Sequence, residues 1–193
     1  GDSNGDGLGD LLLSQPMAST GNLTRNGVIE LISGNAYINI WTAEGTRDGE
    51  MLGAGTKIVD DVDGDTLADV VSYSPEASTN GHYFNGVVTM LSSTDGSQLW
   101  QLEGGSSLER LGEAVTFGGD IDGDTLGDLV LRSPGASTNG FYDNGSISLV
   151  SGASGTLIWT AYGPGHGAAY GSSYQFVGDI NADASLHRVD LDR

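Results

Sequence analysis

Four aspartates lie within the ten residues GDIDGDTLGD, which begin at Gly119. Two carboxylates about 4 Å apart repel each other by roughly 4 kcal/mol at an effective dielectric constant near 20. A loop that gathers four carboxylates is therefore unfavourable unless a cation binds between them. The stretch predicts a site for a metal ion.

The acidic stretch recurs along the chain at a constant spacing. GDSNGDGLGD begins at Gly1, DDVDGDTLAD begins at Asp60, and an altered copy, GDINADASLH, begins at Gly178. The first aspartates of the four copies follow one another at intervals of 59 residues: Asp2, Asp61, Asp120 and Asp179. A fixed period of this length is the sequence signature of a repeat protein.

The spacing of oxygen-bearing side chains within each copy matches the needs of calcium. Calcium accepts about six to eight oxygen ligands, which loop positions 1, 3, 5 and 9 and the backbone carbonyl of position 7 can supply. The absence of His and Cys from these positions favours calcium over zinc or copper. The predicted ligands are Asp2, Asn4, Asp6, Leu8 and Asp10 in the first acidic loop, Asp61, Asp63, Asp65, Leu67 and Asp69 in the second, and Asp120, Asp122, Asp124, Leu126 and Asp128 in the third.

Two other interpretations of the acidic loops fit less well. An EF-hand loop needs an acid at position 12, where this chain has Leu13, Ser72 or Leu131. A solvated acidic turn that binds nothing is the other alternative, and three copies in register argue against it. In the fourth copy His187 replaces the closing aspartate, so we expect calcium binding at Asp179 to be weak or absent.

Short apolar runs between turn residues predict four strands in each unit of the repeat. The first run ends in a proline, and a second run follows an Asn-Gly pair, which we interpret as a tight hairpin turn because both residues accept positive φ. A third run carries a tryptophan that we expect in the core, and a fourth leads into the next acidic loop. This pattern predicts an all-β chain of β-propeller blades, each with four antiparallel strands. The predicted units are residues 1–59, 60–118 and 119–177, with 178–193 as the start of a degenerate fourth.

Twelve strands amount to three blades, whereas propellers close with about four to eight. The chain also begins inside a repeat and without Met. We therefore expect a portion of a longer propeller, or an assembly in which chains complete one another's blades. In such an assembly the strand near Tyr174 to Val177 would pair with the edge at Leu11 to Ser14 of another chain.

Composition excludes several classes of partner and chemistry. The formal net charge is −19, from 26 acidic residues against 7 Lys and Arg, which argues against nucleic acid or an anionic membrane as a partner. The chain has no cysteine, so disulfides, zinc-thiolate sites and thiol nucleophiles are excluded. No apolar run approaches the roughly 18 residues that membrane insertion requires.

These features together resemble the FG-GAP repeat of integrin α-chain β-propellers and related bacterial extracellular proteins. Leu52-Gly53, Leu111-Gly112 and Tyr170-Gly171 stand where the family has Phe-Gly. Gln15-Pro16, Ser74-Pro75 and Ser133-Pro134 stand where it has Gly-Ala-Pro, and Thr66 and Thr125 replace a glycine of the calcium loop. The resemblance implies a secreted or cell-surface adhesion module with calcium in the hairpin between a blade's first and second strands.

The resemblance also implies that ligands bind at the opposite end of the blades. A protein or glycan ligand would contact an aromatic and polar surface there, which we predict to contain Tyr83, Phe84, Arg110, Phe141, Tyr142, Tyr162 and His166. The alternatives are a structural subunit that binds other copies of itself and a non-catalytic part of a secreted hydrolase. We expect no enzymatic activity from the acidic residues, because catalytic acids differ in environment whereas these repeat identically.

Overall fold

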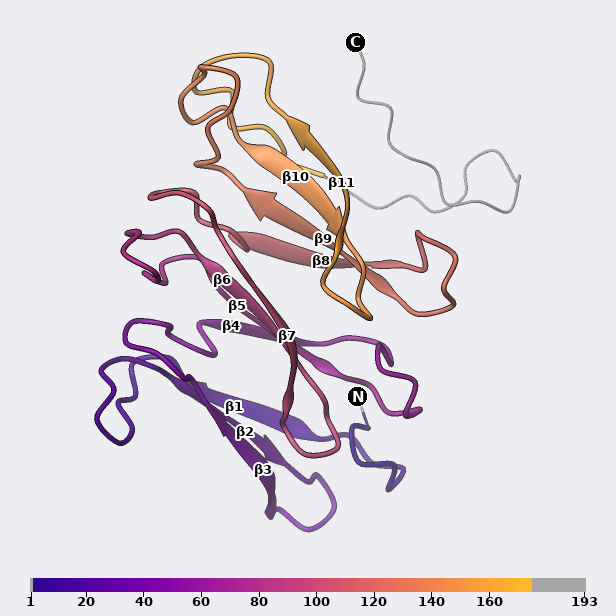
Figure 1. The fold of residues 1–193 in the computed structure, drawn as a ribbon. Helices are drawn as coiled ribbons and strands as arrows, with labels where there is room; N and C mark the ends of the chain where they lie inside the picture. The colour runs from indigo at the N-terminus through magenta and orange to yellow at the C-terminus, as the bar shows by residue number, and fades with distance from the viewer. Residues whose placement is uncertain (1, 175–193) are drawn as a thin grey trace.

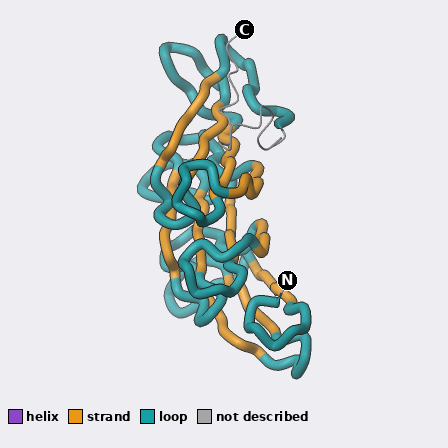
Figure 2. Tube along the Cα trace, turned by 90° about the vertical axis from the view of Figure 1, so that its right-hand side faces the viewer, coloured by secondary structure: helices purple, strands orange, loops and turns teal. Residues whose placement is uncertain are grey.

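The computed structural model of this protein describes residues 2–174, which form three antiparallel sheets and no helix (Figure 1, Figure 2). No helix in this range is long and apolar enough to cross a membrane. The first blade contains β1 (Leu11–Gln15), β2 (Val28–Ile32) and β3 (Asn39–Glu44). The second contains β4 (Gly55–Ile58), β5 (Val70–Ser74), β6 (Val87–Leu91) and β7 (Gln98–Glu103), and the third contains β8 (Ala114–Gly119), β9 (Asp128–Ser133), β10 (Ser146–Val150) and β11 (Leu157–Tyr162). The predicted all-β class is confirmed.

The three blades repeat one strand register. Leu11 pairs with Ile32 in the first blade, Val70 pairs with Leu91 in the second, and Leu129 pairs with Val150 in the third. A register shift follows at the same place in each blade, between Leu31 and Ile32 or its equivalents. The sequence period is therefore also a structural period.

The hydrophobic core lies between successive blades. Ile29, Leu31 and Trp41 of the first blade pack in one cluster with Val70 and Leu91 of the second. A larger cluster joins the second blade to the third and includes Trp100. Trp41 and Trp100 are 6% and 8% exposed, which confirms the predicted packing role, whereas Trp159 is half-buried.

Each complete sheet combines strands from two sequence units. The second sheet takes β4 from the first unit and β5 to β7 from the second, so the first blade lacks a corresponding strand before β1. Within residues 2–174, β1 is therefore an edge, and Leu11 and Leu13 are 54% and 43% exposed. Of the remaining predicted strand, Tyr174 to Val177, only Tyr174 is described, and its hydroxyl accepts a hydrogen bond from the Thr116 hydroxyl of β8 at 3.2 Å. Residues 175–177 lie outside the described residues, and the pairing of this strand with another chain stays a prediction.

The Asn-Gly pairs do not form the tight hairpin turns that the sequence suggested. Positive φ occurs at Phe84 and Gly86, whereas Asn85 between them is not in that region. Asn85 is buried instead, where its Oδ1 accepts a hydrogen bond from the Thr79 backbone at 3.0 Å and its Nδ2 donates to the Gly104 carbonyl at 2.9 Å. The buried loop backbone needs these partners because water does not reach it.

Candidate metal centres

The acidic loops lie at one end of the blades, at the right in Figure 1. The second acidic loop connects β4 to β5, and the third connects β8 to β9. Both are thus hairpin loops between a blade's first and second strands, as the resemblance implied. The first acidic loop precedes β1.

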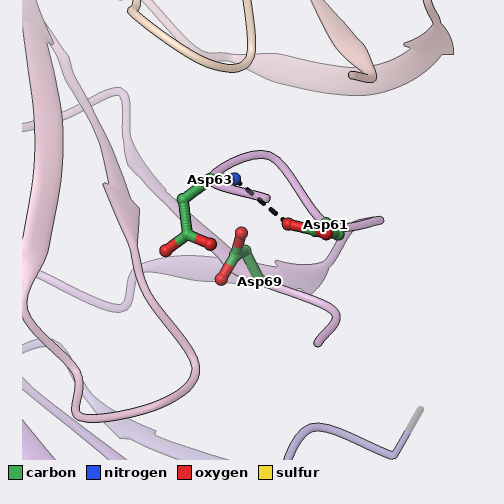
Figure 3. Close-up of side chains that lie close together, drawn as sticks. All are labelled: Asp61, Asp63 and Asp69. Carbon is green, nitrogen blue, oxygen red and sulfur yellow. Dashed lines mark hydrogen bonds between the residues drawn. The ribbon is translucent and has the colours of Figure 1, made fainter. Parts of the chain in front are cut away.

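Three carboxylates converge in the second loop and in the third. One oxygen from each of Asp61, Asp63 and Asp69 lies within 4.8 Å of the others, and Asp120, Asp122 and Asp128 form the equivalent cluster. Figure 3 shows the second loop, with the carboxylates of Asp63 and Asp69 close together. Two ligands on opposite sides of a calcium ion lie about 4.8 Å apart when each bond is about 2.4 Å long. The oxygen spacing therefore fits a calcium ion.

The first aspartate of each loop holds the loop backbone around itself. Asp61 accepts hydrogen bonds from the backbone nitrogens of Gly64 at 2.6 Å and Thr66 at 2.8 Å. Thr66 has a φ of 76°, a conformation that is strained for a β-branched residue. Thr125 has the same conformation in the third loop, where Asp120 accepts its backbone hydrogen bond. Hydrogen bonds to the first aspartate therefore hold the backbone of each of these two loops.

The closing aspartates of the second and third loops, Asp69 and Asp128, are fully buried and tie each loop to the rest of its blade. Asp69 accepts hydrogen bonds from the backbone nitrogens of Val62 at 2.9 Å and Ser93 at 3.0 Å. Burial raises the pKa of Asp69 to about 6, and the charges of Asp63 and Asp65 act in the same direction. Burial likewise raises the pKa of Asp128. A cation would offset the unfavourable burial of these negative charges.

The raised pKa of Asp69 predicts a pH dependence of the metal-free protein. Between about pH 4 and pH 6 the folded protein holds a proton that the unfolded chain, with the ordinary pKa of 3.8, has released. The free energy of unfolding in chelator should therefore fall as pH rises through this window. Urea unfolding of the wild type and of Asp69→Asn at several pH values measures this effect. An identical pH dependence in both proteins would contradict the prediction.

The structure does not bring all the predicted ligands together. Positions 1, 3 and 9 form the clusters, whereas Asp65 accepts hydrogen bonds from the Leu67 backbone at 2.8 Å and from the Thr94 hydroxyl. Asp124 accepts the equivalent bond from the Leu126 backbone, also at 2.8 Å. The ligand roles assigned to position 5 and to the carbonyls of Leu8, Leu67 and Leu126 stay predictions.

The first loop differs because Asn4 occupies position 3. Its Oδ1 accepts a hydrogen bond from the Asp6 backbone at 2.9 Å, just as Asp63 accepts one from Asp65 at 3.1 Å. Its Nδ2 then lies 3.3 Å from both Asp6 Oδ2 and Asp10 Oδ1. An amide donor thus stands among the carboxylates where the other loops have a carboxylate oxygen. The fourth loop, from Asp179 to His187, lies outside the described residues.

The predicted ligand-binding residues lie at the opposite end of the blades, and only some of them meet. The His166 ring contacts Phe141 and Tyr142, with ring centroids 5.1 and 5.6 Å away. His166 Nδ1 also accepts a hydrogen bond from the Tyr142 backbone at 3.0 Å. In the other blades Ser107 and Asp48 cap the equivalent backbone nitrogens, so His166 has a local structural role.

The other residues of that predicted surface are spread over the loops. The side chains of Tyr83, Phe84 and Tyr162 are 72%, 42% and 47% exposed. Arg110 adopts a φ of 56°, and its backbone nitrogen donates to the Phe84 carbonyl at 3.0 Å. A binding role for this surface stays a prediction.

Sequence reasoning missed the residues that complete the buried end of each cluster. Asp10, Asp69 and Asp128 accept backbone hydrogen bonds from Gly34, Ser93 and Gly152 respectively. These donors are main-chain groups in the turns that follow β2, β6 and β10, and their side chains differ. A constant offset of 24 residues from each aspartate is the one sequence signal that accompanies them.

Comparisons with known proteins agree with this architecture. Residues 111–150 match the FG-GAP repeat, and this range contains Leu111-Gly112, the third acidic loop and Ser133-Pro134. No curated protein matches the sequence significantly.

Similar folds occur among solved structures of rhamnogalacturonan lyases. The enzyme YesW is 18% identical with a TM-score of 0.50, over 83% of this chain and 33% of that one. The Bacillus licheniformis enzyme PL11 is 16% identical with a TM-score of 0.54, over 94% and 37%. The exotype enzyme YesX is 18% identical with a TM-score of 0.50, over 87% and 33%. This chain thus covers about a third of each lyase and is similar in fold to that part, and residues 111–150 of its β-propeller blades match the FG-GAP repeat.

Proposed function

We propose that this chain is a calcium-stabilised segment of an extracellular β-propeller that serves as an adhesion or recognition module. The observation that carries the proposal is the pair of equivalent carboxylate clusters, Asp61, Asp63 and Asp69 in the second blade and Asp120, Asp122 and Asp128 in the third. The FG-GAP match over the third loop supports the same conclusion.

The placement of the clusters favours a structural role for the metal ion. Each cluster joins the start of a long loop, at Asp61 or Asp120, to a buried aspartate where the loop meets the following strand: Asp69 directly precedes β5, and Asp128 is the first residue of β9. A bound ion would close the loop onto the sheet and offset the repulsion between the three carboxylates. Equivalent sites in successive blades differ from an active site, which occurs once. The fold likeness to the lyases, at 16–18% identity, does not assign their activity to this chain.

Recognition of a partner would fall to the end of the blades opposite the acidic loops. Tyr83 and Tyr142 occupy equivalent positions in adjacent blades and are 72% and 74% exposed. Exposed aromatic side chains offer apolar area to protein surfaces and ring faces to sugars. We propose a protein or glycan as the partner.

A structural subunit of an extracellular assembly is the second candidate function. The first sheet has three strands where the other two have four, and Leu11 and Leu13 are exposed along its edge strand. A strand from another polypeptide, or from another part of a longer chain, would complete this sheet.

Calcium titration by isothermal calorimetry tests the proposal directly. We expect the second and third loops of the wild type to bind calcium with dissociation constants of about 0.1 to 1 mM, as in extracellular modules, and the first loop to bind it more weakly. Asn4→Asp should strengthen binding at the first loop, because it replaces an amide donor with a carboxylate oxygen next to Asp6 and Asp10. Asp63→Ala together with Asp122→Ala is the control and should remove binding at the second and third loops. Absence of calcium binding to the wild type would reject the proposal.

A further inference from the structure

We infer that the second and third acidic loops are each coupled to the tryptophan of the preceding blade, so that occupation of the loop by calcium is transmitted across the blade interface. The inference rests on the proposed calcium binding and extends it from loop stability to communication between blades. Trp41 and Trp100 are the residues whose surroundings change when calcium binds. The sequence predicts only core packing for both.

One residue connects the tryptophan to the metal cluster at the first interface. Trp41 lies on β3 of the first blade, and its indole nitrogen donates to the Ser93 carbonyl of the second blade at 2.6 Å. The backbone nitrogen of Ser93 in turn donates to Asp69 Oδ1 at 3.0 Å. Trp41, Ser93 and Asp69 are all buried, so water does not compete for these bonds. We call these two consecutive hydrogen bonds, from the Trp41 indole to Ser93 and from Ser93 to Asp69, the indole relay.

The same relay is present at the second interface. Trp100 of the second blade donates to the Gly152 carbonyl of the third blade at 2.6 Å, and Gly152 donates to Asp128 Oδ1 at 3.1 Å. The connecting residue is a serine in one case and a glycine in the other. The relay therefore depends on main-chain groups and on the position of the turn that carries them.

The indole rings fit closely against these turns. Gly96 has a φ of 74°, and a Cβ built on it would lie 2.7 Å from the Trp41 ring. Likewise, a Cβ built on Gly155 would lie 2.8 Å from the Trp100 ring. Because the ring has no space to slide over the turn, a shift of the turn must move the indole or break its hydrogen bond.

Calcium binding acts on the relay through the closing aspartate. Asp69 belongs to the carboxylate cluster and at the same time accepts the Ser93 hydrogen bond. When the carboxylate is drawn toward a cation, the turn that donates to it follows, and the indole at the other end of the relay senses the change. Coupling of this kind is reciprocal. The factor by which calcium binding changes the equilibrium of the Trp41 hydrogen bond is also the factor by which formation of that bond changes the calcium affinity of the second loop.

The third tryptophan provides a control within the same chain. Trp41 and Trp100 each find their acceptor 52 residues further along, at Ser93 and Gly152. Within residues 2–174, the indole nitrogen of Trp159 donates no equivalent hydrogen bond to the turn of a following blade.

Nuclear magnetic resonance of the indole N–H groups tests the inference on the full chain. The protein labelled with ¹⁵N-tryptophan gives three indole signals, which Trp41→Phe, Trp100→Phe and Trp159→Phe assign. On addition of calcium we expect the Trp41 and Trp100 signals to shift by more than a linewidth and the Trp159 signal to stay in place. Asp63→Ala, which removes a predicted ligand and leaves the relay intact, should abolish the Trp41 shift and preserve that of Trp100. Asp122→Ala should do the reverse.

The possible outcomes separate this inference from the proposed function. If calorimetry shows calcium binding while the Trp41 and Trp100 signals stay fixed, or if all three signals move alike, the inference is overturned and the proposed function stands. If no calcium binds, the proposed function fails. The relay is then tested in chelator, where Asp69→Asn should shift the Trp41 signal and Asp63→Asn should not. Equal effects of these two variants would overturn it.

Discussion

Removal of calcium with a chelator is expected to lower the thermal unfolding midpoint of this protein by about 4 to 8 °C. At millimolar calcium, each extracellular-type site adds about 1 kcal/mol to the free energy of unfolding, so two sites add about 2 kcal/mol. For a domain of this size, each kcal/mol corresponds to roughly 2 to 4 °C. The physical origin is the repulsion within the clusters of Asp61, Asp63 and Asp69 and of Asp120, Asp122 and Asp128, which a bound ion offsets.

Calorimetric scans in millimolar calcium and in EDTA measure this difference. Asp63→Ala combined with Asp122→Ala is the control, because these exposed side chains belong to the clusters and lie outside the buried core. The midpoint of the double variant should respond to calcium far less than that of the wild type. A wild-type midpoint that is the same in calcium and in EDTA would contradict a stabilising role for calcium in this fold.

The repeat and its strands could be predicted from the sequence because their signals are local. Proline follows directly after β1, β5 and β9, where a strand must stop for lack of a backbone donor. The period of 59 residues then places every equivalent strand, and the registers of the three sheets agree with it. The placement of the acidic loops between a blade's first and second strands came from the resemblance to the FG-GAP repeat, and the structure has the second and third loops there.

Features that depend on tertiary surroundings could not be predicted. The Asn-Gly pairs carry a strong local turn signal, yet Asn26, Asn85 and Asn144 are fully buried, and the hydrogen-bonding needs of a long buried loop decide their conformation. Either aspartate or asparagine fits position 3 of the calcium-loop pattern, so the pattern does not distinguish Asn4 in the first acidic loop from the aspartates of the other loops. The bond from the Asp6 backbone to Asn4 Oδ1 turns the amide donor toward the cluster, and no sequence pattern shows this.

The metal clusters likewise combine residues whose positions the sequence predicts with residues whose positions depend on tertiary packing. The spacing of the acids brought positions 1, 3 and 9 together as expected, since these lie on one short loop. The donors that hold Asp69 and Asp128 from the other side are backbone groups of Ser93 and Gly152, which have no side-chain signature. Contact of those residues with Trp41 and Trp100 depends on how two blades pack, which a single blade's sequence does not specify.

Replacing the closing aspartate is expected to destabilise the protein far more than replacing its neighbour in the same cluster. Asp69→Ala removes the acceptor for the backbone nitrogens of Val62 and Ser93, both buried. Each buried donor left without a partner costs about 1 to 3 kcal/mol, and the loss of an unfavourably buried charge offsets part of this sum. We expect a net loss of about 2 to 4 kcal/mol in chelator, measured by urea unfolding.

Asp63→Ala is the matched control, because Asp63 is exposed and its carboxylate accepts a single backbone hydrogen bond, from Asp65. In chelator this variant should lie within about 0.5 kcal/mol of the wild type, as exposed substitutions usually do. In calcium both variants should lose the contribution of the second site. Asp69 would then have two separable roles, as an acceptor that organises the loop without metal and as a ligand when metal is present. Equal losses for the two variants in chelator would mean that the buried hydrogen bonds of Asp69 do not organise the loop.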